Sequence, residues 1–219
     1  GAEVPSVRIP APLPDGVSQA TIGVRGGLLR SGFEETAEAL YLTSGYVYSS
    51  AEQAEKAFTG EVDRYVYSRY GNPTISMFEE RLRLIEGAPA AFATGSGMSA
   101  VFTALGALLK AGDRLVAGRS LFGSCFVVCN EILPRWGVET VFVDGADLSQ
   151  WEKALSQPTT AVFFETPSNP MQTLVDIAAV SEMAHAAGAK VLLDNIFATP
   201  MLQKGLPLGV DVVVYSGTK

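Results

Sequence analysis

Short apolar segments alternate with helical patterns along most of the chain, and this alternation restricts the fold more than any other feature. The segment Ala161-Val-Phe-Phe is continuously apolar. A strand of this kind is buried on both faces, as in a mostly parallel sheet with helices on each side. The pattern predicts strands at 90–94, 114–117, 138–143, 160–165, 190–194 and 211–215, and helices near 98–110, 124–133, 147–155 and 176–187. The sequence therefore predicts an α/β fold.

The first part of the chain has a different pattern. Four prolines favour an extended arm over residues 1 to about 20. Residues 40–71 hold most of the tyrosines, whose aromatic surface must pack against something. Asn72 then resembles a helix cap with Pro73 at the first helical position, and Gly87 ends the predicted helix.

Composition excludes several classes of protein. With 219 residues, of which 47% are hydrophobic and 18% charged, the chain can bury a globular core. The net charge of −7 argues against a nucleic-acid partner. Residues 88–109 carry no charge, but Pro89 and the segment Thr94-Gly-Ser-Gly interrupt them, so we expect a buried strand, a turn and a buried helix rather than a membrane span. The start, Gly1-Ala-Glu-Val-Pro, predicts no signal peptide.

The few cysteines and the single histidine limit the chemistry. Cys125 and Cys129 lack the partners of a disulfide framework or a zinc site, so we expect small buried thiols in a reducing cytoplasm. His185 is the only histidine, which excludes a Ser-His-Asp or multi-histidine metal site in this chain. We expect no metal.

The last predicted strand leads into Ser216-Gly-Thr-Lys219. In open α/β sheets, ligands bind at the carboxyl ends of the strands. A lysine held there partly away from water can lose its proton and form a Schiff base with an aldehyde. The hydroxyls of Ser216 and Thr218 could hold a phosphate. Aldehyde plus phosphate favours pyridoxal phosphate (PLP), although a lysine at a strand end is commonly only a solvated charge.

The segment Gly95-Ser-Gly97-Met98-Ser-Ala100 lies between a predicted strand and a predicted helix. Glycines let the backbone approach a ligand, and free N–H groups at a helix start bind anions. The spacing also fits the dinucleotide fingerprint G-x-G-x-x-A, so a nicotinamide-dependent dehydrogenase is an alternative. Because Arg119, not an acid, follows the next strand, only an NADP-type cofactor would suit. A packing turn without a ligand is the third interpretation.

Three further segments add groups suited to such a cofactor. Asp194 closes a predicted strand, where its carboxylate could pair with a ring nitrogen and keep it protonated. The segment Glu165-Thr-Pro-Ser-Asn169-Pro ends another strand in a loop that we expect to line the same crevice. Tyr67 and Arg69 are two residues apart, so in an extended segment both could bind one phosphate.

Together, these motifs resemble the Cys/Met-metabolism family of PLP-dependent enzymes, which has the aspartate-aminotransferase-like (type I) fold. The matching segments, in the family's order and spacing, are Tyr67-Ser-Arg69 with Gly71-Asn-Pro-Thr, Thr94-Gly-Ser-Gly-Met98, Glu165-Thr-Pro-Ser-Asn169-Pro, Asp194-Asn and Ser216-Gly-Thr-Lys219. The resemblance implies that Lys219 is the catalytic residue and forms the Schiff base with PLP, and that Asp194 pairs with the pyridine nitrogen. It implies phosphate binding by Gly97, Met98, Ser216 and Thr218.

The resemblance also implies a shared active site. Tyr67 and Arg69 would bind the phosphate of the neighbouring subunit's cofactor, so a homodimer would be obligatory and a homotetramer usual. Asn169 would lie near the ring hydroxyl and the substrate carboxylate. We then expect residues 1–71 to form an N-terminal arm and dimer-contact segment, and residues 72–219 an incomplete PLP-binding domain. A carboxyl-terminal domain would supply the arginine that binds the substrate carboxylate.

One residue departs from the usual family pattern. Most members carry tyrosine in the loop that stacks on the cofactor ring, whereas this chain has Phe122. Phenylalanine there resembles the O-succinylhomoserine sulfhydrylase branch. That branch implies γ-replacement of succinate by sulfide to give homocysteine for methionine biosynthesis, with Lys219 moving the protons. Cystathionine γ-synthase, cystathionine γ-lyase and a non-catalytic protein of the same fold remain alternatives.

Overall fold

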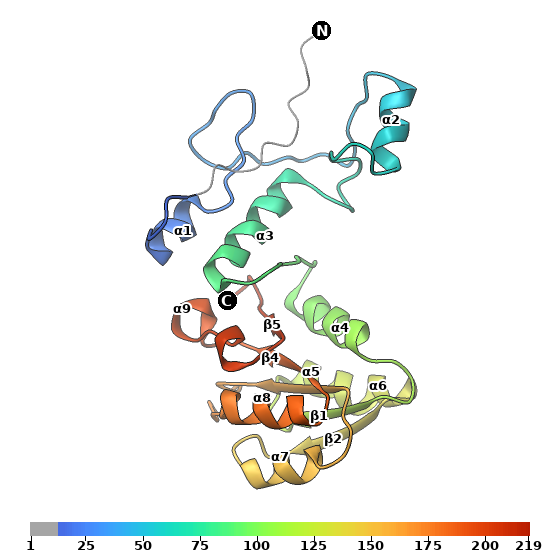
Figure 1. Cartoon of the computed structure of the whole chain (residues 1–219), viewed down its shortest axis with the longest axis vertical. Coiled ribbons are helices and arrows are strands. Elements are labelled where there is room, and N and C mark those ends of the chain that lie inside the picture. The colour runs from blue at the N-terminus through green and yellow to red at the C-terminus, as the bar shows by residue number, and fades with distance from the viewer. Residues whose placement is uncertain (1–12) are drawn as a thin grey trace. The chain divides into compact units, whose positions relative to one another are not determined.

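The computed structural model describes residues 13–219, which form two compact units (Figure 1). The first unit ends at Ala93 and the second begins at Thr94. Most of the predicted extended arm falls on residues 1–12 and lies outside the described residues. The predicted domain boundary after residue 71 stays a prediction.

The first unit holds three helices in its described part, α1 (Gln19–Arg25), α2 (Ala51–Phe58) and α3 (Pro73–Glu86). The predicted ends of α3 are confirmed. The Asn72 side chain accepts the N–H of Thr74 at 2.8 Å, and Gly87 adopts the left-handed conformation, with φ 71°, that ends the helix. Helix α2 was not predicted, because its apolar residues, apart from Phe58, are alanines that give only a weak helical pattern.

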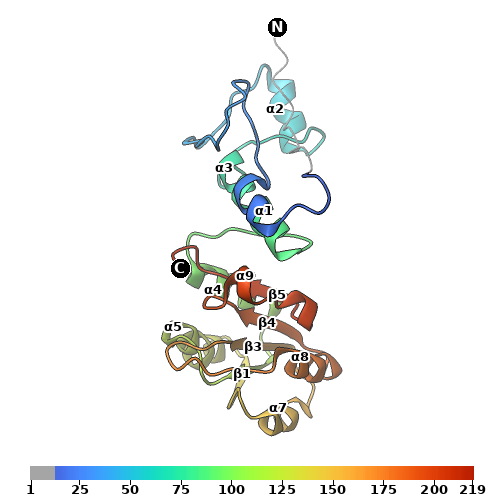
Figure 2. The same ribbon diagram turned by 90° about the vertical axis from the view of Figure 1, so that its left-hand side faces the viewer.

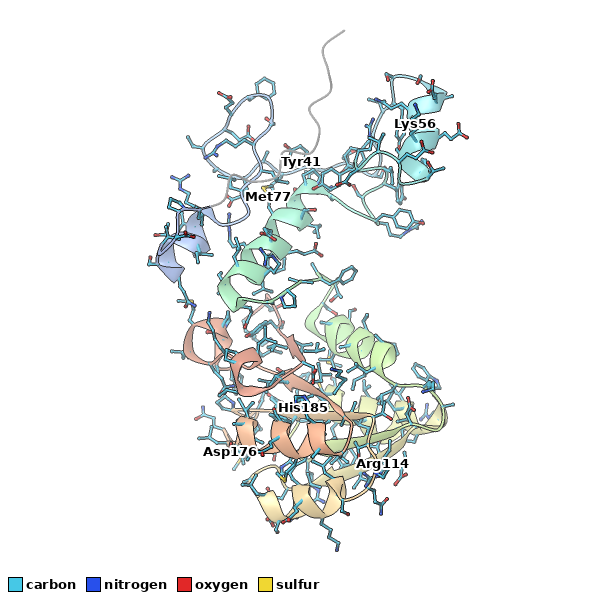
Figure 3. The ribbon with its side chains drawn as sticks, viewed as in Figure 1. Tyr41, Lys56, Met77, Arg114, Asp176 and His185 are labelled. Carbon is cyan, nitrogen blue, oxygen red and sulfur yellow. The ribbon has the colours of Figure 1, made fainter. Side chains whose placement is uncertain are left out.

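Helices α1 and α3 pack together around a small core. Met77 on α3, labelled in Figure 3, is 2% exposed. Gly27, with φ 69°, follows α1 and lies so close to α3 that a methyl group at its Cα would come within 2.9 Å of Glu80 Cβ. The Arg81 guanidinium donates to the Gly26 carbonyl at 2.8 Å, which fixes the end of α1 against α3.

The second unit is built on a five-stranded sheet with the order β2-β1-β3-β4-β5. All the strand pairs are parallel, which confirms the predicted sheet. The strands are β1 (Arg114–Gly118), β2 (Glu139–Val143), β3 (Ala161–Glu165), β4 (Lys190–Asp194) and β5 (Val212–Val214).

One helix precedes β1 and others lie between the strands, as the alternation predicted. They are α4 (Gly97–Leu108), α5 (Gly123–Val127), the π-helical turn η1 (Val128–Ile132), α6 (Leu133–Arg135), α7 (Leu148–Leu155), α8 (Ile177–Ala186), the short α9 (Thr199–Leu202) and the 3-10 turn η2 (Leu206–Leu208). Asp176, labelled in Figure 3, caps α8 by accepting the N–H of Ala179 at 3.0 Å.

Side chains alternate between the two faces of the sheet along each strand. Both faces are buried by helices. On β3, Phe163 packs into one cluster with α4 and the α5–α6 segment, while Phe164 packs into another with α7 and α8. Figure 2 shows α5 and α8 on opposite sides of the strands. Both phenylalanine side chains are 0% exposed. This burial confirms the interpretation of the Ala161-Val-Phe-Phe segment.

The predicted strand at 90–94 is wrong. These residues form no regular element, and Phe92 is 82% exposed. The Ala93 N–H donates to the Glu79 carboxylate at 2.7 Å rather than to a sheet. The segment is rich in alanine, which has a low preference for strands, so its apolar character alone gave a false signal. In the part of the chain that the structure describes, no helix is long and apolar enough to cross a membrane.

Candidate active site

The carboxyl ends of the strands bring most of the predicted site residues to one edge of the sheet. In the parallel register, Glu165 at the end of β3 lies opposite Asp194 at the end of β4, and Asp194 lies opposite Val214 on β5. The loops that leave this edge carry Phe122, Asn169 and the segment 216–219. These are the residues that the sequence analysis assigned to one crevice.

The amino end of α4 offers free N–H donors. Ser96 accepts the N–H of Ser99 on its hydroxyl at 3.1 Å and the N–H of Ala100 on its carbonyl at 3.0 Å. Within residues 13–219, no hydrogen bond uses the N–H of Gly97 or Met98. A methyl group at Gly97 would lie 2.7 Å from Ser216 Cβ, so glycine is required there. Free donors at a helix start beside a serine hydroxyl suit a phosphate.

Asp194 is a buried acid, 1% exposed. Burial raises the pKa of Asp194 to about 6, although its hydrogen bond from the Ile196 N–H, at 3.1 Å, opposes this rise. No ion pair reaches Asp194 from any of the described residues. A buried carboxylate without a cation suits a positively charged ligand group such as a protonated ring nitrogen. The donor set at this edge therefore fits PLP.

Glu165 is a site residue that the sequence analysis did not single out. Its carboxylate, on a residue 4% exposed, accepts the N–H of Phe122 at 2.6 Å and the N–H of Asn169 at 3.1 Å. Burial raises the pKa of Glu165 to about 7, and the negative charge of Asp194 adds to this rise. The available signal was its position: like Asp194, it is an acid that closes a continuously apolar strand.

Lys219, assigned to the Schiff base by resemblance, has an exposed side chain. It lies in a turn beyond β5, closed by a hydrogen bond from the Lys219 N–H to the Ser216 carbonyl at 3.1 Å, and not within the sheet. Thr218 is also exposed, while Ser216 is half-buried beside α4.

A buried amide network joins three strand ends next to the site. Asn195, 0% exposed, donates to the Tyr215 hydroxyl at 2.7 Å and to the Gln203 carbonyl at 2.8 Å. The Gln203 side chain donates to the Asn195 amide oxygen at 2.7 Å and to the Thr166 carbonyl at 2.9 Å. The network therefore links the ends of β3 and β4 to the residue before Ser216. Its members lie on separate elements, so no local pattern indicated it.

Tyr67 and Arg69 belong to the first unit. The expectation that they lie in an extended segment is wrong, since residues 68–70 form a turn whose Tyr70 and Gly71 N–H groups donate back to the Tyr67 carbonyl at 2.9 and 3.1 Å. The turn still keeps the two side chains together. The Arg69 guanidinium lies 5.0 Å from the centre of the Tyr67 ring, a cation–π distance.

The two cysteines are free and buried, as predicted. Burial raises the pKa of both thiols to about 12, so both stay protonated at neutral pH. Cys125 also lies against Met98, with 3.7 Å between the two sulfur atoms. These thiols are packing residues behind the start of α4 and not nucleophiles.

Comparison with known proteins gives a family match over nearly the whole chain. Residues 20–219 match the family described as Cys/Met metabolism PLP-dependent enzyme. The chain is 84% identical over 214 residues to an O-succinylhomoserine sulfhydrylase of Mycobacterium tuberculosis (strain H37Rv), covering 98% of this chain and 53% of the relative. It is 45% identical over 205 residues to the O-succinylhomoserine sulfhydrylase of Pseudomonas aeruginosa, covering 94% and 51%. The chain thus spans about half the length of the curated relatives it matches.

Solved structures agree with this match. Crystal structures of metB from Corynebacterium glutamicum and of a putative O-acetylhomoserine (thiol)-lyase from Campylobacter jejuni superpose with TM-scores of 0.84 and 0.86, each at 30% identity. They cover 94% and 93% of this chain, and this chain covers 52% and 50% of theirs. The second carries N'-pyridoxyl-lysine-5'-monophosphate. These findings favour the PLP interpretation of the Gly95–Ala100 segment over the nicotinamide one.

Proposed function

We propose, since this chain belongs to the Cys/Met metabolism PLP-dependent enzyme family, that the protein exchanges the succinyl group of O-succinylhomoserine for sulfide. The products would be homocysteine and succinate. One observation carries the choice of substrates: identity to the O-succinylhomoserine sulfhydrylase of M. tuberculosis is 84%, whereas identity to methionine γ-lyases is 38–41%.

The residues at the sheet edge would hold PLP in the following way. The N–H groups of Gly97 and Met98 would bind the phosphate together with the hydroxyls of Ser216 and Thr218. Asp194 would keep the ring nitrogen protonated, which its burial without a cation favours. Phe122 would pack on the ring, and Asn169 would donate to its hydroxyl group.

When bound, PLP supplies an electron sink that makes removal of the substrate Cα proton accessible. The Lys219 amine would first hold the cofactor covalently and, once released, would take that proton as a general base. The same amine would then deliver a proton at a later step. Phe122 has no hydroxyl, so it would position the ring without moving protons.

The proposal extends to assembly and location. Tyr67 and Arg69 would bind the phosphate of a neighbouring subunit's cofactor in a homodimer, with dimers pairing into a tetramer. The guanidinium stacked on the Tyr67 ring supports this role, since the two groups already lie together. The free, buried state of both cysteines supports a reducing compartment, so we place the protein in the cytoplasm.

Substrate competition tests the reaction. The full-length protein is supplied with O-succinylhomoserine and either sulfide or cysteine, and the sulfur product is identified. Faster formation of homocysteine from sulfide is expected. A strict preference for cysteine would instead indicate a cystathionine γ-synthase, and rapid cleavage of cystathionine would indicate a γ-lyase.

Chemical trapping tests the lysine. Borohydride reduction should fix PLP on the peptide that contains Lys219, as mass spectrometry would show. Lys219→Ala should remove this label and lower kcat by about 10²- to 10⁴-fold. Lys153→Ala is the matched control, because Lys153 is an exposed lysine on α7. Full turnover by Lys219→Ala would exclude the catalytic assignment.

A further inference from the structure

Glu165 joins two loops that leave the sheet from different strands. Its Oε2 accepts the N–H of Phe122, which lies between β1 and α5, at 2.6 Å. Its Oε1 accepts the N–H of Asn169, in the loop after β3, at 3.1 Å. A single buried carboxylate therefore sets the positions of both the aromatic residue and the amide residue that the proposed cofactor site uses.

Among residues 13–219, two titratable groups lie next to this carboxylate. Asp194 on β4 is its register neighbour, and Cys125 lies on α5. Burial raises the pKa of Cys125 to about 12, and the charges of both acids contribute to this rise, so the thiol stays neutral. Burial together with the charge of Asp194 raises the pKa of Glu165 to about 7. Near neutral pH, Glu165 is thus divided between its ionised and protonated forms.

The two forms of Glu165 differ in what they can bind. An ionised carboxylate accepts hydrogen bonds on both oxygens, whereas a protonated one has a donor on one of them. Only the ionised form can therefore accept both N–H groups at full strength, since hydrogen bonds to a charged acceptor are the stronger ones. The link between the two loops depends on the charge of this one side chain.

We propose that Glu165 is a positioning residue whose ionised carboxylate clamps the Phe122 loop to the Asn169 loop, and that a cationic ring nitrogen beside Asp194 strengthens this clamp. The second part rests on the proposed function. A positive charge beside Asp194 offsets the negative charge that repels ionised Glu165. The coupling is reciprocal, so the ionised clamp also favours the cationic ligand.

A titration of the wild-type, full-length protein tests both parts. The protein is labelled with ¹⁵N-phenylalanine, and the Phe122 amide signal, assigned by its loss in Phe122→Leu, is followed over pH with and without PLP. Without PLP, the signal should shift with a midpoint near the pKa of Glu165, about 7. With PLP, the midpoint should fall by about one pH unit or more, because the cation stabilises the ionised carboxylate.

The clamp and its coupling to PLP are tested by separate results of the titration. A Phe122 amide that does not titrate in the PLP-free protein overturns the clamp, and a midpoint that PLP leaves unmoved overturns the coupling. Failure to bind PLP at all overturns the coupling together with the proposed function, but the titration without PLP still decides the clamp. A merely structural role for Glu165 would not make the midpoint depend on PLP.

Two variants separate the effect of the charge of Glu165 from the effect of its side-chain length. Glu165→Gln keeps one acceptor oxygen and removes the charge, while Glu165→Asp keeps the charge and shortens the side chain. Because the clamp needs both, each should weaken equilibrium binding of PLP about tenfold. Glu139→Gln is the control, since the Glu139 side chain is 65% exposed at the start of β2 and lies at the opposite ends of the strands. Wild-type affinity in both Glu165 variants would overturn the proposal.

Discussion

The two units differ in how much of their large apolar side chains is buried. In the second unit, Phe163 and Phe164 are 0% exposed and belong to two closed clusters. In the first unit, Phe33, Leu42 and Val47 are 96%, 94% and 91% exposed. The second unit is therefore specified by its own core, whereas the first presents apolar surface of the kind that protein contacts cover.

The two buried acids at the site of the second unit differ from the shifted carboxylic acids of the first unit in the direction of their pKa shifts. In the first unit, hydrogen bonds from Ser31 lower the pKa of Glu35, and a hydrogen bond from Arg83 lowers that of Glu80. In the second, burial raises the pKa of Glu165 and Asp194. Folding thus favours the ionised form of the first pair and the protonated form of the second. Acids whose pKa values a fold raises well above the ordinary range are typical of functional sites.

The largest expected effect tests the contrast in cores. Phe164→Ala should lower the free energy of unfolding by about 3–5 kcal/mol, because it leaves a cavity between β3 and the α7–α8 face. Phe33→Ala, at an exposed position of the first unit, should change it by less than about 0.5 kcal/mol. Urea denaturation of the full-length protein at fixed concentration measures both. Similar losses in the two variants would mean that Phe33 is covered in the assembled protein.

The next largest effect tests the contrast in pKa shifts between these acids. Because Glu165 and Asp194 have raised pKa values when folded, the folded protein binds more protons than the unfolded chain between about pH 4 and 7. Stability of the PLP-free protein should therefore fall as pH rises through this window, by about 3 kcal/mol from each of the two residues. Asp194→Asn should flatten the curve of urea midpoint against pH. An unchanged slope would show that these acids are not the source.

A pair of glycines tests how closely the second unit is packed at its site. Gly97→Ala places a methyl group against Ser216, whereas Gly95→Ala meets no atom within 4 Å. The first change should weaken PLP binding by about 1–3 kcal/mol through overpacking, and the second should be close to neutral. Fluorescence titration with PLP measures both. Equal affinities would argue against a phosphate at the start of α4.

The smallest effect concerns Asn72, a buried polar residue of the first unit. Asn72 caps α3 and also donates to the Tyr41 carbonyl at 2.9 Å and the Ser68 hydroxyl at 3.1 Å. Asn72→Ala should cost about 1–2 kcal/mol, measured by urea denaturation. The control is Asn130→Ala, because Asn130 is exposed within a helical segment. A loss near zero for Asn72→Ala would mean that the first unit gains its order elsewhere.

The elements that could be predicted from the sequence are those whose signal lies within a few neighbouring residues. Continuous apolar runs gave β3 and β4 because each run carries its own burial signal. The helix α3 was predicted from Asn72, Pro73 and Gly87 because caps act over one turn. The apolar run at 90–94 led to a wrong prediction, since a strand also needs a neighbouring strand to pair with. No residue close to this run in the sequence specifies such a strand.

What could not be predicted depends on contacts between distant segments. The carboxylate of Glu165 meets the N–H of Phe122 only because β1 and β3 are neighbours, and strand order is a property of the whole sheet. The same holds for Asn195, whose partners lie on other elements. The turn at Arg69 is set by hydrogen bonds to the Tyr67 carbonyl, which the spacing of two residues does not indicate.

The strand order β2-β1-β3-β4-β5 has a consequence for where any ligand can bind. After β1 the chain turns to α5 on one face of the sheet, and after β3 it turns to α8 on the other. The loops diverge at this topological switch point, the position where ligands bind in open α/β sheets. The hydrogen bond between Glu165 and Phe122 joins the two loops at this point. The connectivity of the sheet opens the binding position, and one buried acid holds its two sides at a fixed separation.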